Sequence, residues 1–134
     1  MITVYKSIEN ELRIIDEPVV GSWLNVVKPS SQEVAMLKEL GIPQDYITYS
    51  LDIDERARTE REDGQLLILL RVSHYEGENA DIPYITIPLG IIMTDHYIVT
   101  ICQQENEVVQ EMTRLRDLST IKRNRFVLRL LLRA

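Results

Sequence analysis

The feature that most constrains the fold is an abrupt change of character between residues 50 and 72. The stretch SLDIDERARTERED, residues 50–63, holds nine charged residues in fourteen, whereas QLLILLRV, residues 65–72, holds one. Asp63-Gly64, between the two runs, is a strong signal for a hairpin turn. The pattern predicts an open sheet in which the charged run is the edge strand and residues 65–72 form a central strand buried on both faces.

The charged run also contains the Asp-x-Asp start of a calcium-binding loop, at Asp52 and Asp54. An EF-hand loop then needs an oxygen ligand at its fifth position, glycine at its sixth and glutamate at its twelfth. Those positions hold Arg56, Ala57 and Asp63, so the EF-hand interpretation fails. We interpret the run as a solvated connection and an edge strand whose mixed charges discourage pairing with another chain.

Short runs of alternating or β-branched residues predict the other strands, at residues 2–5, 12–15, 22–27, 84–93 and 97–103. Pro88 lies inside the fourth of these runs and cannot donate to a strand ladder, so we expect a bulge or an edge there. The residues TDH at 94–96 predict a hairpin between the last two strands.

Helix signals follow the third predicted strand. Ser30 and Glu33 fit a capping box, and Gly41 stands where a helix C-cap favours glycine. Pro43 suits the first turn of a second helix. Two further helical patterns close the chain, at 105–118, with Val108, Met112 and Leu115 on one face, and from near residue 119, with Phe126, Leu130 and Ala134 on one stripe. Strands first, two helices between them and helices last predict an α/β or α+β layered domain with a mixed, largely antiparallel sheet.

The chain of 134 residues is expected to be a single domain, 1–134. Its net charge of −6 argues against nucleic acid as a partner, because binding a phosphate backbone needs a basic face. No run approaches the roughly 18 apolar residues of a membrane span, and we expect a soluble chain. The final helical stripe stops without glycine or proline, which suggests a segment cut from a longer protein.

Candidate chemistry is sparse. Cys102 lies in an apolar stretch and is expected to pack as a small buried residue rather than to pair with His96 as a nucleophile. Neither His74 nor His96 has neighbours at the spacings of zinc ligands. Glu76, Glu78 and Asp81 gather in one stretch, where carboxylates could bind magnesium or calcium, although solvated loop charges explain them equally well. No catalytic set of acid, base and nucleophile is visible, so we do not expect an enzyme.

Three stretches, taken in order, resemble the amino-terminal cytoplasmic domain of CorA-type magnesium and cobalt transporters. They are WLNVVKPSSQE at 23–33, LGIPQDYITYSLDIDERARTEREDGQLLILLRV at 40–72 and IIMTDHYIVTICQ at 91–103. Family features among them are a tryptophan on a strand, a serine and glutamate that open a helix, and a later hairpin ending in a threonine like Thr100. The likeness covers most of the chain.

The resemblance implies an α/β/α sandwich on the cytoplasmic side of the membrane, assembled as a homopentamer, with divalent cations bound between neighbouring domains as a gate sensor. Magnesium would then be a regulatory ligand, and Glu76 would supply a sensor carboxylate, with Glu78 and Asp81 beside it. The family's two membrane helices and Gly-Met-Asn signature, and most of the long helix that leads to them, are absent from these 134 residues. The alternative hypothesis is a free-standing interaction or small-ligand module with the same fold.

Overall fold

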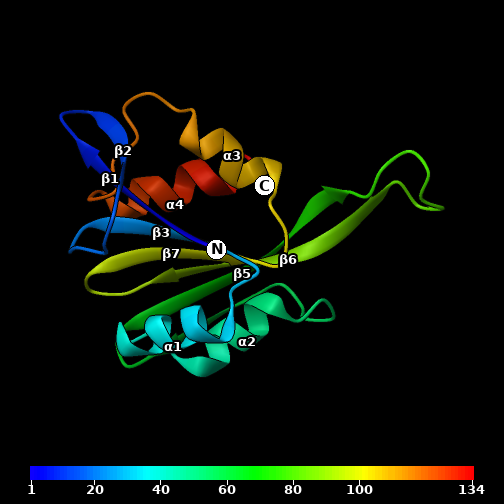
Figure 1. Cartoon of the computed structure of the whole chain (residues 1–134), viewed down its shortest axis with the longest axis horizontal. Helices are drawn as coiled ribbons and strands as arrows, with labels where there is room; N and C mark the ends of the chain where they lie inside the picture. The colour runs from blue at the N-terminus through cyan, green and yellow to red at the C-terminus, as the bar shows by residue number, and fades with distance from the viewer.

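A computed structural model describes all 134 residues as one seven-stranded sheet with helices on both faces (Figure 1). The strand order is β2-β1-β3-β7-β6-β5-β4. Neighbouring strands are antiparallel except β3 and β7, which pair in parallel. The mixed, largely antiparallel sheet predicted from the sequence is therefore confirmed. The strands are β1 (Ile2–Ile8), β2 (Glu11–Ile15), β3 (Ser22–Val27), β4 (Arg58–Glu62), β5 (Gln65–Tyr75), β6 (Tyr84–Met93) and β7 (Tyr97–Cys102).

Four helices form the two outer layers. Figure 1 shows α1 (Ser31–Glu39) and α2 (Gln44–Leu51) on one face of the sheet, and α3 (Glu107–Thr113) and α4 (Arg123–Leu131) on the other. Each pair of helices covers a separate hydrophobic core, because side chains on successive strand residues point to opposite faces of the sheet. The core under α3 and α4 includes Trp23 and Phe126, and the core under α1 and α2 includes Leu37 and Ile47.

The helix signals are mostly confirmed. Ser30 is the N-cap of α1, and its hydroxyl accepts from the Glu33 N–H while the Glu33 carboxylate accepts from the Ser30 N–H. The hydrogen bond from the Ser30 backbone is the main reason why the pKa of Glu33 is lowered. Pro43 is the N-cap of α2 and lies one residue before its first turn. Helix α3 ends at Thr113, so at its C-terminal end the helix is shorter than the pattern predicted at 105–118.

One strand prediction needs correction. β5 is an interior strand, but it lies next to the edge strand β4 and is not buried evenly on both faces: Leu67 and Leu69 are buried on one face, and only Val72 is buried on the other. On its other face Ile68 and Leu70 are half-buried, since only a strand of charged side chains lies beyond β5. Of the two alternatives expected at Pro88, a bulge or an edge, the bulge is absent, because β6 pairs with β5 in one unbroken register.

Pro88 fits because it lies one residue beyond the end of the β6–β7 ladder. The last pair of that ladder is Leu89 with Cys102. The Pro88 carbonyl faces the β7 side, where it accepts a hydrogen bond from the Cys102 thiol at 3.4 Å. On its β7 side, β6 has no pairing partner at Pro88, so the missing N–H of proline costs no ladder hydrogen bond there. Pro88 therefore lies at a local edge, the second of the two predicted alternatives.

A short polar chain crosses the sheet inside the α3–α4 core. The indole Nε1–H of Trp23 donates to Thr100 Oγ1 at 2.9 Å, and the Thr100 hydroxyl donates to Asn25 Oδ1 at 2.9 Å. Tyr5 stacks on the Trp23 ring, and Phe126 meets it edge-on, both with centroids 4.8 Å apart. Trp23 therefore joins the parallel β3–β7 pair to α4, as a core aromatic.

Candidate cation site on the β5–β6 arm

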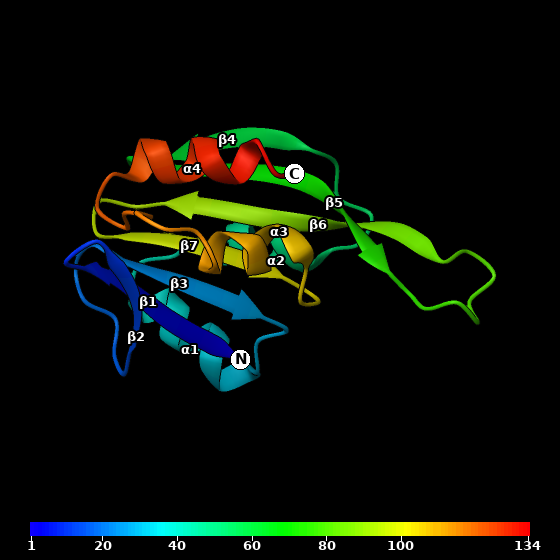
Figure 2. The same cartoon turned by 90° about the horizontal axis from the view of Figure 1, so that it is seen from above.

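The hairpin of β5 and β6 extends well beyond the rest of the sheet (Figures 1 and 2). β4 pairs with β5 only as far as Leu69, and β7 pairs with β6 only from Leu89 onward. Beyond these points the two strands form a ribbon of their own, closed by the loop 76–83. We call residues 71–88 the arm. The sequence predicted the two strands and the loop between them, but neither their pairing nor the reach of the ribbon, because nothing local marks where the neighbouring strands stop.

Arg71 anchors the base of the arm. Its guanidinium donates to the carbonyl and hydroxyl of Thr86 at 2.7 and 3.0 Å, across the ribbon. It also donates to the carbonyls of Ile53 and Glu55 at 2.9 and 2.8 Å. One side chain therefore ties the ribbon to the segment that follows α2. A two-stranded ribbon has little stability of its own in water, so this fixed fork of donors helps to set the direction of the arm.

The outer end of the arm is held by aromatic and backbone contacts. Tyr75 and Tyr84 are directly opposite in the ladder, and their ring centroids lie 5.1 Å apart. The Glu76 N–H donates to the Pro83 carbonyl at 2.7 Å, which closes the loop. Gly77 has φ +110°, a conformation that favours glycine. The loop therefore has a defined path out of β5 and back into β6.

The three predicted ligands, Glu76, Glu78 and Asp81, all lie in this loop with exposed side chains. No lysine or arginine occurs between Val72 and Met93, so the arm beyond Arg71 is uniformly acidic. No three or more Asp, Glu, His or Cys side chains anywhere in the chain are placed to hold one metal ion. One chain therefore presents these carboxylates outward without completing a cation site, and their ligand role stays a prediction.

A second group of titratable side chains lies at the base of the arm and was missed in the sequence. A hollow of about 210 Å³ between the arm and the start of α3 is lined by His74 and Tyr84 on one side and by Glu105 and Glu107 on the other. Glu105 also acts on Tyr5, which does not line this hollow. Burial is the larger cause and the negative charge of Glu105 the second cause of a raised pKa at Tyr5. About thirty residues separate His74 from Glu105, and no local spacing motif could have linked them.

The charged run at 50–63 makes its ion pairs within itself. Arg58 pairs with Glu55 and, at 3.0 Å, with Glu60, and its guanidinium lies over the Tyr49 ring. The Asp52 carboxylate accepts from the Asp54 N–H at 3.0 Å, a local turn rather than an ion site. The prediction that β4 is an edge strand is confirmed.

Comparison with known proteins agrees with this architecture. The α/β/α domain with its mixed seven-stranded sheet has the fold of the soluble domain of CorA from Methanocaldococcus jannaschii, with a TM-score of 0.74 and 20% identity over 99% of this chain and 55% of that one. The family model described as CorA-like Mg2+ transporter protein matches residues 20–132. The chain therefore belongs to the CorA-like Mg2+ transporter family. No curated protein sequence matches it.

Two further structures share the fold. The complete CorA magnesium transporter from M. jannaschii matches with a TM-score of 0.70 and 19% identity, over 85% of this chain and 36% of that one. The ZntB cytoplasmic domain from Vibrio parahaemolyticus RIMD 2210633 matches with a TM-score of 0.66 and 13% identity, over 84% of this chain and 47% of that one. The chain thus spans only part of the length of each. None of its own helices is both long and apolar enough to cross a membrane.

Proposed function

We propose that this chain is the cytoplasmic regulatory domain of a transporter for divalent cations, magnesium or cobalt, and that it senses the cation by reversible binding rather than catalysing a reaction. Residues 1–134 would act as one domain, joined to membrane helices through sequence beyond residue 134. The domains would assemble as a homopentamer at the cytoplasmic side of the membrane. The family match over residues 20–132 supports the transporter assignment.

The acidic arm is the observation that carries the sensing role. Glu76, Glu78 and Asp81 are exposed at the end of a hairpin that leaves the body of the domain. Magnesium requires six oxygen ligands in octahedral geometry and gives up its water reluctantly, so one or two carboxylates hold it weakly and through water. A neighbouring copy that brought further carboxylates to the loop would complete the shell. Cation binding would then couple to the arrangement of the subunits.

The hollow at the base of the arm adds further negative charge near the proposed cation site. Glu105 and Glu107 line it opposite His74, and they add negative potential close to the arm. Carboxylates that face the same solvent attract divalent cations, an effect that falls off within about 8 Å at physiological ionic strength. These residues would raise the local cation concentration without themselves forming a closed site.

A magnesium titration of the 134-residue chain, followed by amide chemical shifts, tests the location. We expect binding in the millimolar range or weaker, with the largest shifts in residues 74–84, and a loss of several-fold in affinity for Glu76→Gln. The matched control is Asp52→Asn with Asp54→Asn, which removes two carboxylates elsewhere and should leave the affinity within about twofold. Micromolar binding that Glu76→Gln leaves unchanged would place the site elsewhere.

The competing function, a free-standing interaction or small-ligand module, is distinguished by the parent reading frame. Two apolar spans of roughly 20 residues near its C-terminus, the first ending in Gly-Met-Asn, would support transport. A stop codon directly after residue 134 would support the competing function.

A further inference from the structure

Charge is divided very unevenly along this chain. Residues 114–134 hold seven basic residues and one acidic residue, for a net charge of +6, and the other 113 residues carry −12. The basic segment begins at Arg114, the C-cap of α3, and comprises the loop that follows and the whole of α4. An otherwise acidic domain therefore has one concentrated basic region, on the face of the sheet that α3 and α4 cover.

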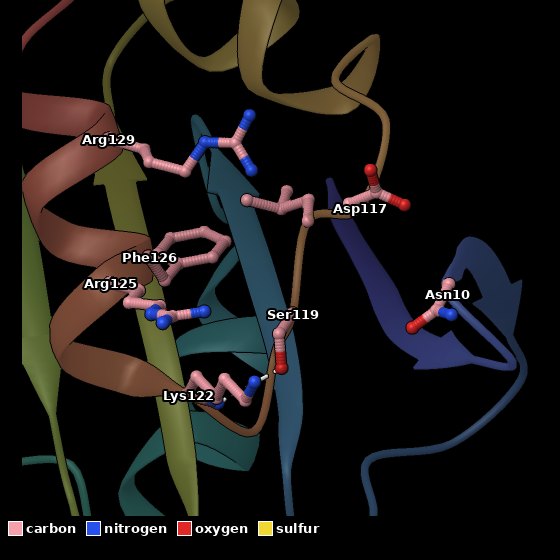
Figure 3. A pocket seen from close by; sticks show the side chains of 8 residues that line it. Asn10, Asp117, Ser119, Lys122, Arg125, Phe126 and Arg129 are labelled. Atoms are coloured by element: carbon pink, nitrogen blue, oxygen red, sulfur yellow. Dashed lines mark hydrogen bonds between the residues drawn. The ribbon is translucent and has the colours of Figure 1, made fainter.

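Part of this region forms a pocket (Figure 3). The pocket has a volume of about 310 Å³, and six of its eight lining residues are polar or charged. Lys122, Arg125 and Arg129 line it from α4, and Figure 3 shows Asp117 and Asn10 on its opposite side. The four charged side chains sum to +2, so the pocket is a concave and positively charged surface.

No ion pair neutralises the cations of the pocket. Lys122 and Arg125 form no ion pair, and Arg129 donates only to the Arg116 carbonyl, at 3.5 Å. Asp117, the one acid present, is not paired with any of them. Like charges held together without partners repel one another, and an anion in the pocket would relieve that repulsion.

The start of α4 adds to the same positive potential. Its N-cap, Lys122, makes no side-chain capping bond, and its first turn contains no acidic residue. The N–H groups of Asn124 and Arg125 have no acceptor in the chain. A helix N-terminus carries a partial positive charge that favours anions, so basic residues at this position oppose the helix dipole instead of compensating it.

We propose that this pocket binds a small phosphate-bearing anion through Lys122, Arg125 and Arg129. Ligand pockets usually measure about 300–1,000 Å³ and are mostly apolar, whereas this one is at the lower limit and mostly polar. Its size fits a phosphate or diphosphate group better than a whole nucleotide. Arginine binds phosphate with two parallel N–H donors. The phosphate comes from a free anion or from a phospholipid headgroup, and the site is independent of the proposed cation site.

Titration of the ¹⁵N-labelled chain with pyrophosphate, without magnesium, tests the free anion. We expect amide shifts concentrated in residues 117–129 and an affinity loss of about three- to fivefold for Arg125→Gln, the upper part of the range for one surface charge pair. The matched control is Arg114→Gln, which removes the same charge from an exposed arginine outside the pocket and should stay within about twofold. Arg125 is exposed, and an unchanged spectrum elsewhere shows that the variant is folded.

Co-sedimentation with phosphatidylcholine vesicles, with and without phosphatidic acid, tests the lipid source. The pocket is assigned to a lipid headgroup if vesicle binding requires phosphatidic acid and is weakened by Arg125→Gln but not by Arg114→Gln. It is assigned to a free anion if the chain binds pyrophosphate but does not bind these vesicles. The proposal is overturned if neither probe binds, or if Arg114→Gln weakens binding as much as Arg125→Gln. It is also overturned if the chain self-associates through this face and Arg125→Gln abolishes that association while neither probe binds.

Discussion

Gly90 of β6 lies directly against Ser50 of α2. A Cβ atom built at Gly90 would be 1.8 Å from Ser50 Oγ and 2.6 Å from Ser50 Cβ. Ser50 is fully buried, and its hydroxyl donates to the Tyr46 carbonyl at 2.7 Å, so it cannot turn away. The absence of a side chain at residue 90 is therefore what lets α2 approach the centre of the sheet.

We expect Gly90→Ala to destabilise the domain by about 1–3 kcal/mol, the cost of overpacking a dense core. Urea unfolding of the wild type and the variant measures the change. The double variant Ser50→Gly with Gly90→Ala removes the clash, so it should show favourable coupling between the two positions. If the two substitutions simply add, Ser50 does not set the distance between α2 and the sheet.

Thr100 is the acceptor for the only tryptophan in the chain. Thr100→Val keeps the shape but leaves the buried Trp23 N–H without a partner, at an expected cost of about 1–3 kcal/mol. Unfolding followed by Trp23 fluorescence measures the loss. Thr113→Val is the control, because the Thr113 hydroxyl donates only to a carbonyl one turn earlier in α3 at an exposed position, and it should cost much less. Equal losses would mean that the Trp23–Thr100 bond adds nothing specific.

Burial raises the pKa of the Cys102 thiol. In an unfolded chain, a cysteine thiol ionises at about pH 8.5. Below that pH the thiol is protonated in both states and its contribution to stability is complete. As the pH rises toward the folded pKa, only the unfolded state loses the proton and stability falls, by at most about 1.4 kcal/mol per pH unit.

Wild type and Cys102→Ala should therefore differ more at pH 7 than at pH 10 in free energy of unfolding. Every other residue is the same in both proteins, so pH effects from the rest of the chain cancel in the comparison. A difference that is the same at both values would show that Cys102 ionises equally in the folded and unfolded chains.

Helix α4 is expected to open below the global stability. It has nine residues, no side-chain N-cap and basic residues at its positive end, although Phe126 and Leu130 are fully buried. Arg123→Glu, outside the pocket, should stabilise α4 by about 0.3–1 kcal/mol through the helix dipole, and Arg123→Gln should have a smaller effect. Native-state hydrogen exchange measures both. Protection in α4 equal to that of Leu67 and Leu69 in β5 would contradict this expectation.

Arg71 should control the arm more than its surface position suggests. Arg71→Gln removes the donors to Ile53 and Glu55 at the base, so amide exchange in residues 73–86 should speed up while β7 keeps its protection. Arg13→Gln is the control, since Arg13 pairs only with Glu11 on the exposed edge strand β2. Unchanged exchange in the arm would mean that the Tyr75–Tyr84 pair alone holds it.

The sequence predicted the local elements well, because their signals lie within a few residues of one another. Ser30 and Glu33 marked the start of α1, Asp63-Gly64 marked the β4–β5 turn, and both φ values at that turn are positive, as such a hairpin requires. The charged run correctly marked an edge strand. For the candidate site, the sequence identified Glu76, Glu78 and Asp81 as neighbours in a loop.

Tertiary structure alone decided the rest, because those features depend on where partners end or meet. The apolar sequence of β5 predicts a strand buried on both faces. Its burial also depends on the neighbouring strand, which is the charged edge strand β4. Pro88 is tolerated because β7 ends one residue short of it. The hollow beside Glu105 and the pocket around Arg125 each join segments far apart in the chain, which no local spacing encodes. Side-chain periodicity sets which face of an element is buried; only packing sets which distant charges share a surface.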